Sequence, residues 1–416
     1  MISRKKMLKI LAGLPLFGGL AAGTTFGMSR SDRDKIRDSD NESRDLFEEM
    51  GIRTLINGRG TLTFLSGSLM LPEVVEAIRS TSHEFADLRE VQDKVGQRIA
   101  ELLDCEGAMV TSGAAGALTL GTAAAITGTD EELIRGLPDI PGPRREVIIQ
   151  KNHRYGYDHA VRNTGIKMVE VESVDQMEDA INKNTVMGLF FNAASQFGGF
   201  EDFISREKFV EICKRHQIVS FIDAAADVPP AENLFKYIEM GFDLVTFSGG
   251  KAIRGPQSAG LLYGRKDLIE AAKLNHSPNS NSIGRGLKVN KEEIFGMYVA
   301  LESYLNMDHE AQWQQWLDWV DRIAASAKTV ETVQSETQIN EGPANHFPNL
   351  RLSWDQDRLG ITPGEVADAL KNGSPSIEVS GRRESLNVSV AMLKPDHVDI
   401  VGSRIKEVLE TANAKN

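Results

Sequence analysis

The stretch Asp243-Leu-Val-Thr-Phe-Ser-Gly-Gly-Lys251-Ala-Ile-Arg-Gly-Pro-Gln257 decides how the rest of the chain is interpreted. Its apolar, β-branched run, residues 244–247, predicts a buried strand that ends at Ser248. The glycine-rich loop that follows holds a single lysine, Lys251. A lysine at a strand end has no helix face to lie along, and burial lowers its pKa, as a Schiff-base lysine requires. On its own, Ser-x-x-Lys is more typical of an ordinary surface loop, so its meaning depends on the residues upstream.

Length and composition limit the class of protein. The chain has 416 residues, of which 41% are hydrophobic and 25% charged, enough for one large domain and a smaller one. Its net charge of -12 argues against a nucleic-acid partner, because nucleic-acid-binding surfaces are normally basic. Cys105 and Cys213 lie in apolar, helix-like contexts, which predicts two buried thiols rather than a disulfide.

The first 28 residues resemble an export signal. A basic segment precedes a short apolar stretch, residues 10–22, that is too short to span a bilayer comfortably. Ser3-Arg-Lys-Lys-Met-Leu-Lys9 is similar to the twin-arginine motif, with Lys5 in place of the second arginine. We therefore expect an exported protein, periplasmic or secreted, with a non-cleaved membrane anchor as the alternative. Residues 29–49 are polar and charged and predict a linker.

Strand-like and helix-like segments alternate from residue 50 to residue 290. Strands are expected at 146–150, 167–171, 186–191 and 218–222, in addition to the run before Lys251. This alternation predicts an α/β fold, with a mostly parallel sheet and helices on both faces. Ligands of such sheets gather at the carboxyl ends of the strands. The residues expected on that rim are Ser112, His153, Asn192, Asp223 and Lys251.

The pattern changes after residue 290. Two long helical stretches, 292–306 and 312–328, are followed by short strands and helices. This predicts a smaller α+β domain over residues 291–416. The large domain then covers residues 50–290 and begins with an N-terminal arm.

Two further motifs carry chemistry. Ala108-Met-Val-Thr-Ser-Gly-Ala-Ala-Gly-Ala117 predicts a strand, a turn of small residues and a helix start, an arrangement that binds anions through backbone N–H groups. Small residues at a helix start also occur for packing alone. Asp223 ends a strand 28 positions before Lys251 (251 − 223 = 28), and no His/Cys/carboxylate group of metal spacing lies beside it, so no metal is expected. The remaining alternatives are a structural cap and a carboxylate that keeps a pyridinium nitrogen protonated.

Four features follow one another along the chain: the anion-binding turn at Ser112, the aromatic His153, the strand-end Asp223 and the Ser-x-x-Lys motif that ends at Lys251. In this order they resemble the fold-type I pyridoxal-phosphate enzymes. The resemblance runs from about Gly51 to about Ser385. Within these enzymes the sequence is most similar to the group around bacterial selenocysteine synthase (L-seryl-tRNA selenium transferase) and D-glucosaminate-6-phosphate ammonia-lyase. The motifs that carry the resemblance are Ile56-Asn-Gly-Arg-Gly-Thr61, Thr111-Ser-Gly-Ala-Ala115, His153, Asp223-Ala-Ala-Ala226, Ser248-Gly-Gly-Lys251, Arg254-Gly-Pro-Gln257 and Gly284-Arg-Gly-Leu-Lys-Val289.

The resemblance implies a role for each residue of the site. Lys251 would form a Schiff base with pyridoxal 5'-phosphate and move the Cα proton of the substrate. Asp223 would pair with the pyridine nitrogen, and His153 would stack on the ring. The residues implied to hold the phosphate are Ser112, Gly113, Ala114 and Ser248.

Four arginines are implied to bind the cofactor or the substrate. Arg285 would reach either of them from a neighbouring subunit, because such sites form at the interface of a homodimer. Arg59, Arg254 and Arg382 are candidates for a substrate carboxylate or phosphate, since the guanidinium fork matches those anions. For each of these three, a structural salt bridge is the alternative.

The expected function is a lyase that acts on an amino acid or amino-sugar acid by α,β-elimination. A selenium transferase, an aminotransferase, an aldolase and a racemase begin with the same step and remain alternatives. A non-catalytic pyridoxal-phosphate binder belongs to another class, and the presence of Lys251 and Asp223 argues against it. Two departures from the family matter. The selenium transferases carry an N-terminal tRNA-binding segment where this chain has a signal-like one, and export argues against a phosphorylated intracellular substrate.

Overall fold

The computed structural model describes residues 44–140, 142–143, 145–198 and 201–414. The expected export signal therefore lies outside the described residues, as does most of the expected linker. The chain divides into two compact units, Met1–Thr54 and Leu55–Asn416. The described part of the first unit contains helix α3 (Leu46–Glu49), whose N-terminus is capped by the side chain of Asp45. Within the described ranges, no helix has the length and apolar character needed to cross a membrane.

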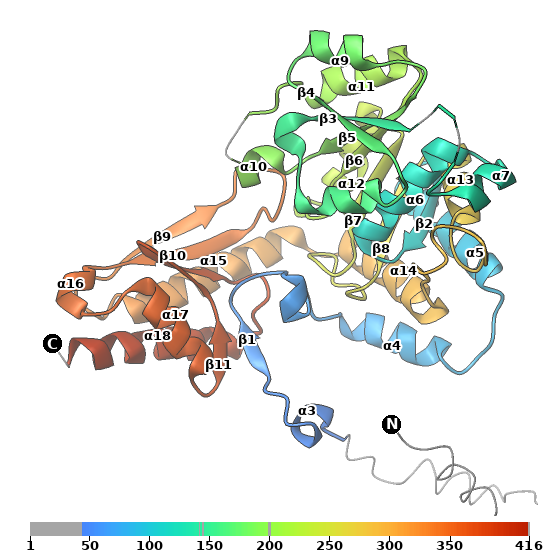
Figure 1. Cartoon of the computed structure of the whole chain (residues 1–416). Helices are drawn as coiled ribbons and strands as arrows, with labels where there is room; N and C mark the ends of the chain where they lie inside the picture. The colour runs from blue at the N-terminus through green and yellow to red at the C-terminus, as the bar shows by residue number, and fades with distance from the viewer. Residues whose placement is uncertain (1–43, 141, 144, 199–200, 415–416) are drawn as a thin grey trace, which may run out of the picture. The chain divides into compact units, whose positions relative to one another are not determined.

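The main sheet of the second unit has seven strands in the order β2-β8-β7-β6-β5-β3-β4 (Figure 1). Neighbours from β4 to β7 pair in parallel, whereas β8 is antiparallel to both β7 and β2. The predicted mostly parallel α/β sheet is thus confirmed. The strands are β2 (Gly107–Thr111), β3 (Glu146–Gln150), β4 (Lys167–Val171), β5 (Thr185–Phe191), β6 (Val219–Asp223), β7 (Leu244–Ser248) and β8 (Gly260–Gly264).

Helices cover both faces of this sheet, because successive side chains of the central strands point to opposite faces and are apolar on both. Phe221 and Leu244 pack on the face that α6 covers, while Ile222 and Val245 belong to the core on the other face. Helix α6 approaches closely because it is built of small residues: a Cβ at Gly121 would lie 2.5 Å from the ring of Phe221. The helices around the sheet are α4 (Pro72–Thr81), α5 (Leu88–Leu102), α6 (Gly113–Thr127), α7 (Glu131–Gly136), α8 (His159–Arg162), α9 (Val174–Ala180), α10 (Ala194–Gly198), α11 (Arg206–Arg215), α12 (Asn233–Met240), α13 (Lys266–Leu274) and α14 (Lys291–Leu305), with short 3-10 turns η1 (Thr63–Leu65), η2 (Lys151–His153) and η3 (Gly156–Asp158).

The free edge of β2 is covered by a side chain. Gln92 of α5 donates its amide N–H to the carbonyl of Val110 (2.7 Å), and its Oε1 accepts the N–H of Val110 (3.0 Å). The amide of Gln92 thus takes the place of a neighbouring strand, which prevents pairing with another chain at this position.

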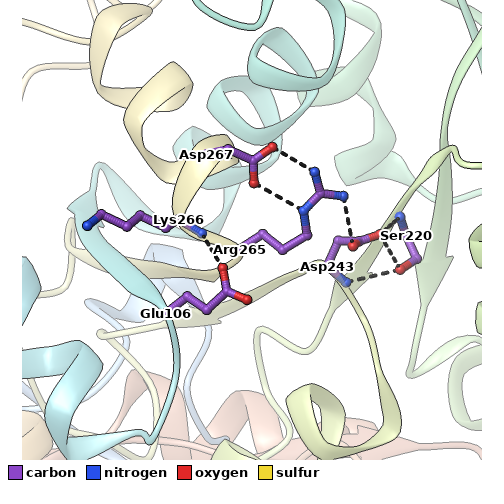
Figure 2. Close-up of polar contacts among 6 residues, drawn as sticks. All are labelled: Glu106, Ser220, Asp243, Arg265, Lys266 and Asp267. Carbon is purple, nitrogen blue, oxygen red and sulfur yellow. Dashed lines mark hydrogen bonds and ion pairs between the residues drawn. The ribbon is translucent and has the colours of Figure 1, made fainter.

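A polar network fixes the amino ends of β6 and β7 (Figure 2). Asp243 accepts hydrogen bonds from the N–H (2.8 Å) and the hydroxyl (2.9 Å) of Ser220. Arg265 forms ion pairs with Asp243 (3.1 Å) and with Asp267 (2.6 Å). Asp243 precedes β7, and Lys251 follows it. The network therefore fixes the amino ends of the strands and leaves their carboxyl ends for ligands.

A second core lies in the C-terminal part of the chain, around a four-stranded antiparallel sheet of order β12-β13-β10-β9. Strand β1, from the N-terminal arm, pairs in parallel with β11 beside the same core. Helix α14 contributes Met297 and Leu301 to the core of the large sheet, although the sequence pattern assigns residues 291–305 to the smaller domain. The remaining elements are β1 (Leu55–Asn57), α15 (His309–Ala327), β9 (Gln334–Ile339), β10 (Pro348–Ser353), α16 (Gln356–Leu359), α17 (Pro363–Asn372), β11 (Ser376–Glu378), β12 (Ser380–Arg382), β13 (Ser385–Ser389) and α18 (His397–Asn413).

Candidate active site

Lys251 lies in the loop between β7 and β8, at the carboxyl edge of the large sheet. The N–H of Gly249 donates to the carbonyl of Ala259 (2.9 Å), which closes the loop at its base. A Cβ at Gly250 would come within 2.7 Å of the backbone of Gln257, so only glycine fits there without a shift. The glycines of the motif thus let two backbone segments meet and hold Lys251 in a fixed loop.

The N-terminal arm packs against this loop. Ser68 donates its N–H to the carbonyl of Gly250 (3.1 Å). Arg254 donates its Nε to the carbonyl of Leu69 (2.9 Å), and the N–H of Leu71 returns a bond to the carbonyl of Arg254 (3.3 Å). Arg254 has a φ of +56°, a left-handed conformation that is strained for arginine and persists only where its surroundings fix it. One role of Arg254 is therefore structural: it holds the arm on the lysine loop.

Two buried carboxylates, Asp223 and Asp227, act on Lys251. Burial lowers the pKa of the Lys251 amine below its usual range, while attraction to Asp223 and Asp227 acts in the opposite direction. A lowered pKa increases the share of neutral amine, which is the form that acts as a nucleophile and accepts a proton. Lys251 therefore has the environment that its predicted role requires.

Asp223 ends β6 and is only 4% exposed. Its Oδ1 accepts the N–H of Ala225 (3.1 Å), and its Oδ2 accepts the hydroxyl of Tyr155. Burial raises the pKa of Asp223; the hydrogen bonds from Tyr155 and Ala225 and the charge of Lys251 lower it. The site thus holds a carboxylate with a defined orientation close to the lysine.

Asp227, four positions after Asp223, belongs to a buried hydrogen-bonded cluster. Its Oδ2 accepts from the amide of Asn192 and from the hydroxyl of Tyr237 (3.0 Å), and Arg206 donates to Oδ1 of Asn192. Burial raises the pKa of Asp227 to about 6 against the effect of these two donors. The cluster ties Asn192, the residue after β5, to the segment that follows Asp223.

The start of α6 fits a phosphate group. The hydroxyl of Ser112, the N-cap of α6, is buried and has no hydrogen-bond partner among the described residues. A Cβ at Gly260 would lie 2.5 Å from the backbone of Gly113 and 2.7 Å from that of Ala114, so β8 packs directly against the first turn of the helix. A helix N-terminus lined by small residues and an unpaired buried hydroxyl is a site for an anion. Ser248 lies nearby, since it pairs with Gly260, the residue that packs against this first turn.

His153 does not present a free ring face. Its side chain is 0% exposed, its Nδ1 accepts the N–H of Phe191 (3.3 Å), and its Nε2 donates to Asp202 (2.9 Å). The ring also meets Phe190 edge to face, with centroids 4.5 Å apart. A ring enclosed in this way has no surface on which a cofactor could stack, and the aromatic side chain that contacts Asp223 is Tyr155.

The structure does not bring Arg382 to Lys251. Asn345, in the loop before β10, donates its N–H to the carbonyl of Ala226 (2.8 Å), so the start of β10 lies beside the Asp223 segment. Strand β10 begins opposite Ser389, the last residue of β13, whereas Arg382 pairs with Ser385 at the other end of that strand. A hollow of about 530 Å³ at that end is lined by Arg351, Arg382, Arg383, Glu384 and Ser385.

The other two predicted arginines have separate surroundings. Arg59 pairs with Glu378 (3.4 Å) and lies over the ring of Phe64, with 5.6 Å to its centroid. Arg285 is exposed, in a loop that is closed by a bond from the N–H of Gly284 to the carbonyl of Asn275 (2.9 Å). Arg59 thus has the structural salt bridge that is the alternative to substrate binding, and Arg285 remains accessible.

Sequence reasoning missed Tyr155 and the role of Asp227. Tyr155 follows His153 by two residues, so the aromatic signal in that segment was detected but not assigned to the tyrosine. Asp227 stands four positions after Asp223, and an acidic residue so close to a strand end is a signal that could have been used. Across the described residues, no cluster of three His, Cys, Asp or Glu side chains could hold a metal ion.

The fold and this combination of lysine, aspartate and phosphate cradle define a fold-type I pyridoxal-phosphate enzyme. A sequence model of the L-seryl-tRNA selenium transferase (SelA) family matches residues 87–341, and the chain belongs to this family. It is 27% identical over 381 residues to D-glucosaminate-6-phosphate ammonia lyase of Salmonella typhimurium, covering 88% of this chain and 98% of that protein. It is 24% identical over 376 residues to 5'-C-glycyluridine monooxygenase-decarboxylase of a Streptomyces species, covering 87% and 92%.

Solved structures agree with these sequence matches. The structure of a D-glucosaminate-6-phosphate ammonia-lyase superposes with a TM-score of 0.79 at 25% identity, covering 89% of this chain and 99% of that one. The predicted family, the fold type and the pyridoxal-phosphate cofactor are thereby confirmed, and the chain is an enzyme.

Proposed function

We propose that this enzyme is an ammonia-lyase that acts on an amino-sugar acid or a related amino acid by α,β-elimination. The observation that carries the proposal is Lys251, an amine of lowered pKa in a fixed loop that also interacts with the carboxylate of Asp223. The similarity to an ammonia lyase over 98% of that protein's length supports the reaction type.

The residues of this chain have separate tasks in that reaction. Pyridoxal phosphate, when bound, supplies an electron sink that stabilises negative charge on the Cα of an amino substrate. The first turn of α6, with Ser112, Gly113 and Ala114, would hold its phosphate, and Asp223 its ring nitrogen. Lys251 would hold it covalently.

Lys251 is also the group suited to proton transfer. Displaced by the substrate amine, it would be free to accept the Cα proton, a transfer that its lowered pKa favours, and to release it to a departing β-hydroxyl, which leaves as water. The eliminated product is an enamine. Its hydrolysis by one water then gives one ammonia and one 2-keto acid for each substrate molecule. Asp223 and Asp227 stabilise the protonated amine between these two transfers.

Incubation with a panel of amino-sugar acids and β-hydroxy amino acids tests the reaction. We expect ammonia and 2-keto acid to appear in equal amounts from at least one member of the panel. Keto acid without ammonia would contradict a lyase and indicate an aminotransferase. Inversion of configuration at the Cα of the substrate would indicate a racemase, and formation of an aldehyde would indicate an aldolase.

A transferase is the second candidate, favoured by the family match over residues 87–341. The glycyluridine monooxygenase-decarboxylase matches 92% of its own length, so similarity of this extent is shared by enzymes with different named reactions. A requirement for a second substrate before any product forms would favour the transferase over the lyase.

We infer that the enzyme is a homodimer with shared active sites. Several apolar side chains of the arm beside the Lys251 loop are exposed, and burying them would be favourable. These side chains are Leu62, Phe64, Leu69, Met70 and Val75. The exposed Arg285 is the residue that would enter the partner's site. Sedimentation of the intact protein tests this inference, and a monomer at micromolar concentration would contradict it.

We also propose export, because a basic segment precedes an apolar stretch at the N-terminus. A periplasmic or secreted location is expected, with a membrane anchor as the alternative. Mass spectrometry of the native protein decides between these: a mature N-terminus beyond residue 22 supports cleavage, whereas an intact Met1 in the cytosolic fraction excludes export.

A further inference from the structure

We propose that Tyr155 is a positioning residue of the cofactor site, and that its hydroxyl holds the Asp223 carboxylate in place for the ring nitrogen of pyridoxal phosphate. This role rests on the cofactor site of the proposed function. It adds a residue that the sequence motifs did not single out.

Tyr155 is itself held by a chain of contacts that begins at His153. Asp202 binds Nε2 of His153, and Nδ1 of that ring accepts the N–H of Phe191 at the end of β5. The ring of Tyr155 stacks on that of Phe191, with centroids 3.8 Å apart and planes 7° apart. The enclosed histidine thus fixes the end of β5, and the stack fixes the direction of the Tyr155 hydroxyl.

The hydroxyl of Tyr155 binds one oxygen of Asp223 and leaves other lone pairs of the carboxylate for a ligand. Tyr155 donates to Oδ2, and the N–H of Ala225 occupies Oδ1. A carboxylate has about four lone-pair positions, so one donor on each oxygen leaves space for a third hydrogen bond. The carboxylate is therefore oriented by the protein before it meets the cofactor.

Tyr155 also favours the ionised form of Asp223. Burial raises the pKa of Asp223, and the hydrogen bond from Tyr155 is the largest effect that lowers it, followed by Ala225 and Lys251. The pKa of Tyr155 is held well above its usual value by burial, by the charges of Asp223 and Asp158, and by Tyr157. Tyr155 consequently remains a protonated donor over the whole range in which Asp223 titrates.

Only an ionised Asp223 can form an ion pair with a protonated ring nitrogen. Loss of the Tyr155 hydroxyl removes the donor on Oδ2 and moves the pKa of Asp223 further upward. Cofactor affinity should then begin to fall at a higher pH on acidification than it does in the wild type. A residue that only supports the fold would weaken binding without moving this pH limit.

Tyr155→Phe is the direct test, because it keeps the stacked ring and removes the hydroxyl. The holoenzyme is dialysed at fixed concentrations of free pyridoxal phosphate between pH 5 and pH 8, and the bound fraction is read from visible absorbance. We expect the variant to bind about tenfold more weakly near neutral pH, the usual effect of losing a hydrogen bond to a charged group. Its loss of affinity on acidification should occur at higher pH than in the wild type.

Tyr157→Phe is the matched control, since Tyr157 lies two residues away, is 68% exposed and keeps the same chemistry. In an Asp223→Asn background, Tyr155→Phe should cause no further shift of the pH limit, which separates a direct effect on Asp223 from general loosening. A Tyr155→Phe protein with the affinity and pH limit of Tyr157→Phe would overturn the inference. Wild-type protein that binds no pyridoxal phosphate would instead overturn the proposed function.

Discussion

Replacing Lys251 with alanine should lower ammonia release by about 10⁴-fold or more, the upper range for losing one general acid–base group. Alanine removes both the amine that would hold the cofactor and the group that would carry the proton, so the two losses coincide. Lys251→Arg should fail as well, because a guanidinium does not deprotonate near neutral pH. Steady-state ammonia release and the visible absorbance of the purified variants measure the two losses.

Lys291→Ala is the matched control for this prediction. Lys291 is a partly buried lysine whose amine is bound by Glu292 and by the carbonyl of Thr81 (2.7 Å), outside the site. Borohydride should fix the cofactor on the peptide that contains Lys251 in both the wild type and the control. An adduct on a different lysine, or full turnover in Lys251→Ala, would contradict the assignment.

The parallel core of the sheet could be predicted because its signals are local. Each central strand is a short apolar run, as in Leu244–Ser248, bounded by turn residues, and burial of both faces requires this composition. Strand β8 (Gly260–Gly264) lacks such a signal, since it has glycine at each end and interrupts the alternation of strands and helices. Strand β9 (Gln334–Ile339) is polar up to its last residue and has no buried residue, so no apolar run marks it in the sequence.

Part of the site could likewise be predicted from local signals, and part could not. Asp223, Lys251 and the turn at Ser112 each end or follow a strand of one sheet, so the topology brings them to one edge once the strands are known. The contact of Tyr155 with Asp223 joins residues 68 positions apart, and no local pattern indicates which of two aromatic residues will make it. For Arg382, the register of the β12–β13 pair decides which end of the sheet it occupies, and register depends on tertiary packing.

Replacing Asp223 with asparagine should lower turnover by about 10²- to 10³-fold, the size of effect seen when a charged group that stabilises the transition state is removed. Asparagine is isosteric but cannot keep a ring nitrogen protonated by charge. Cofactor retention should fall less than turnover, because the first turn of α6 and Lys251 are unchanged. The measurements are ammonia release, the bound cofactor fraction and the melting temperature as a function of pH.

The raised pKa of Asp223 also predicts the direction in which the melting temperatures change with pH. The pKa of Asp223 is raised in the folded protein, so the stability it contributes is present below its ordinary pKa of about 3.9 and is lost as pH rises through the raised value. The difference in melting temperature, Asp223→Asn minus wild type, should therefore increase with pH. Asp267→Asn is the control of opposite sign, since Arg265 lowers the pKa of Asp267 and the stability of that pair is lost on acidification. For each variant, the melting-temperature difference from the wild type is plotted against pH. Equal slopes for the two variants would show that Asp223 is not a buried carboxylate held ionised at a cost in stability. Its proposed role requires that property.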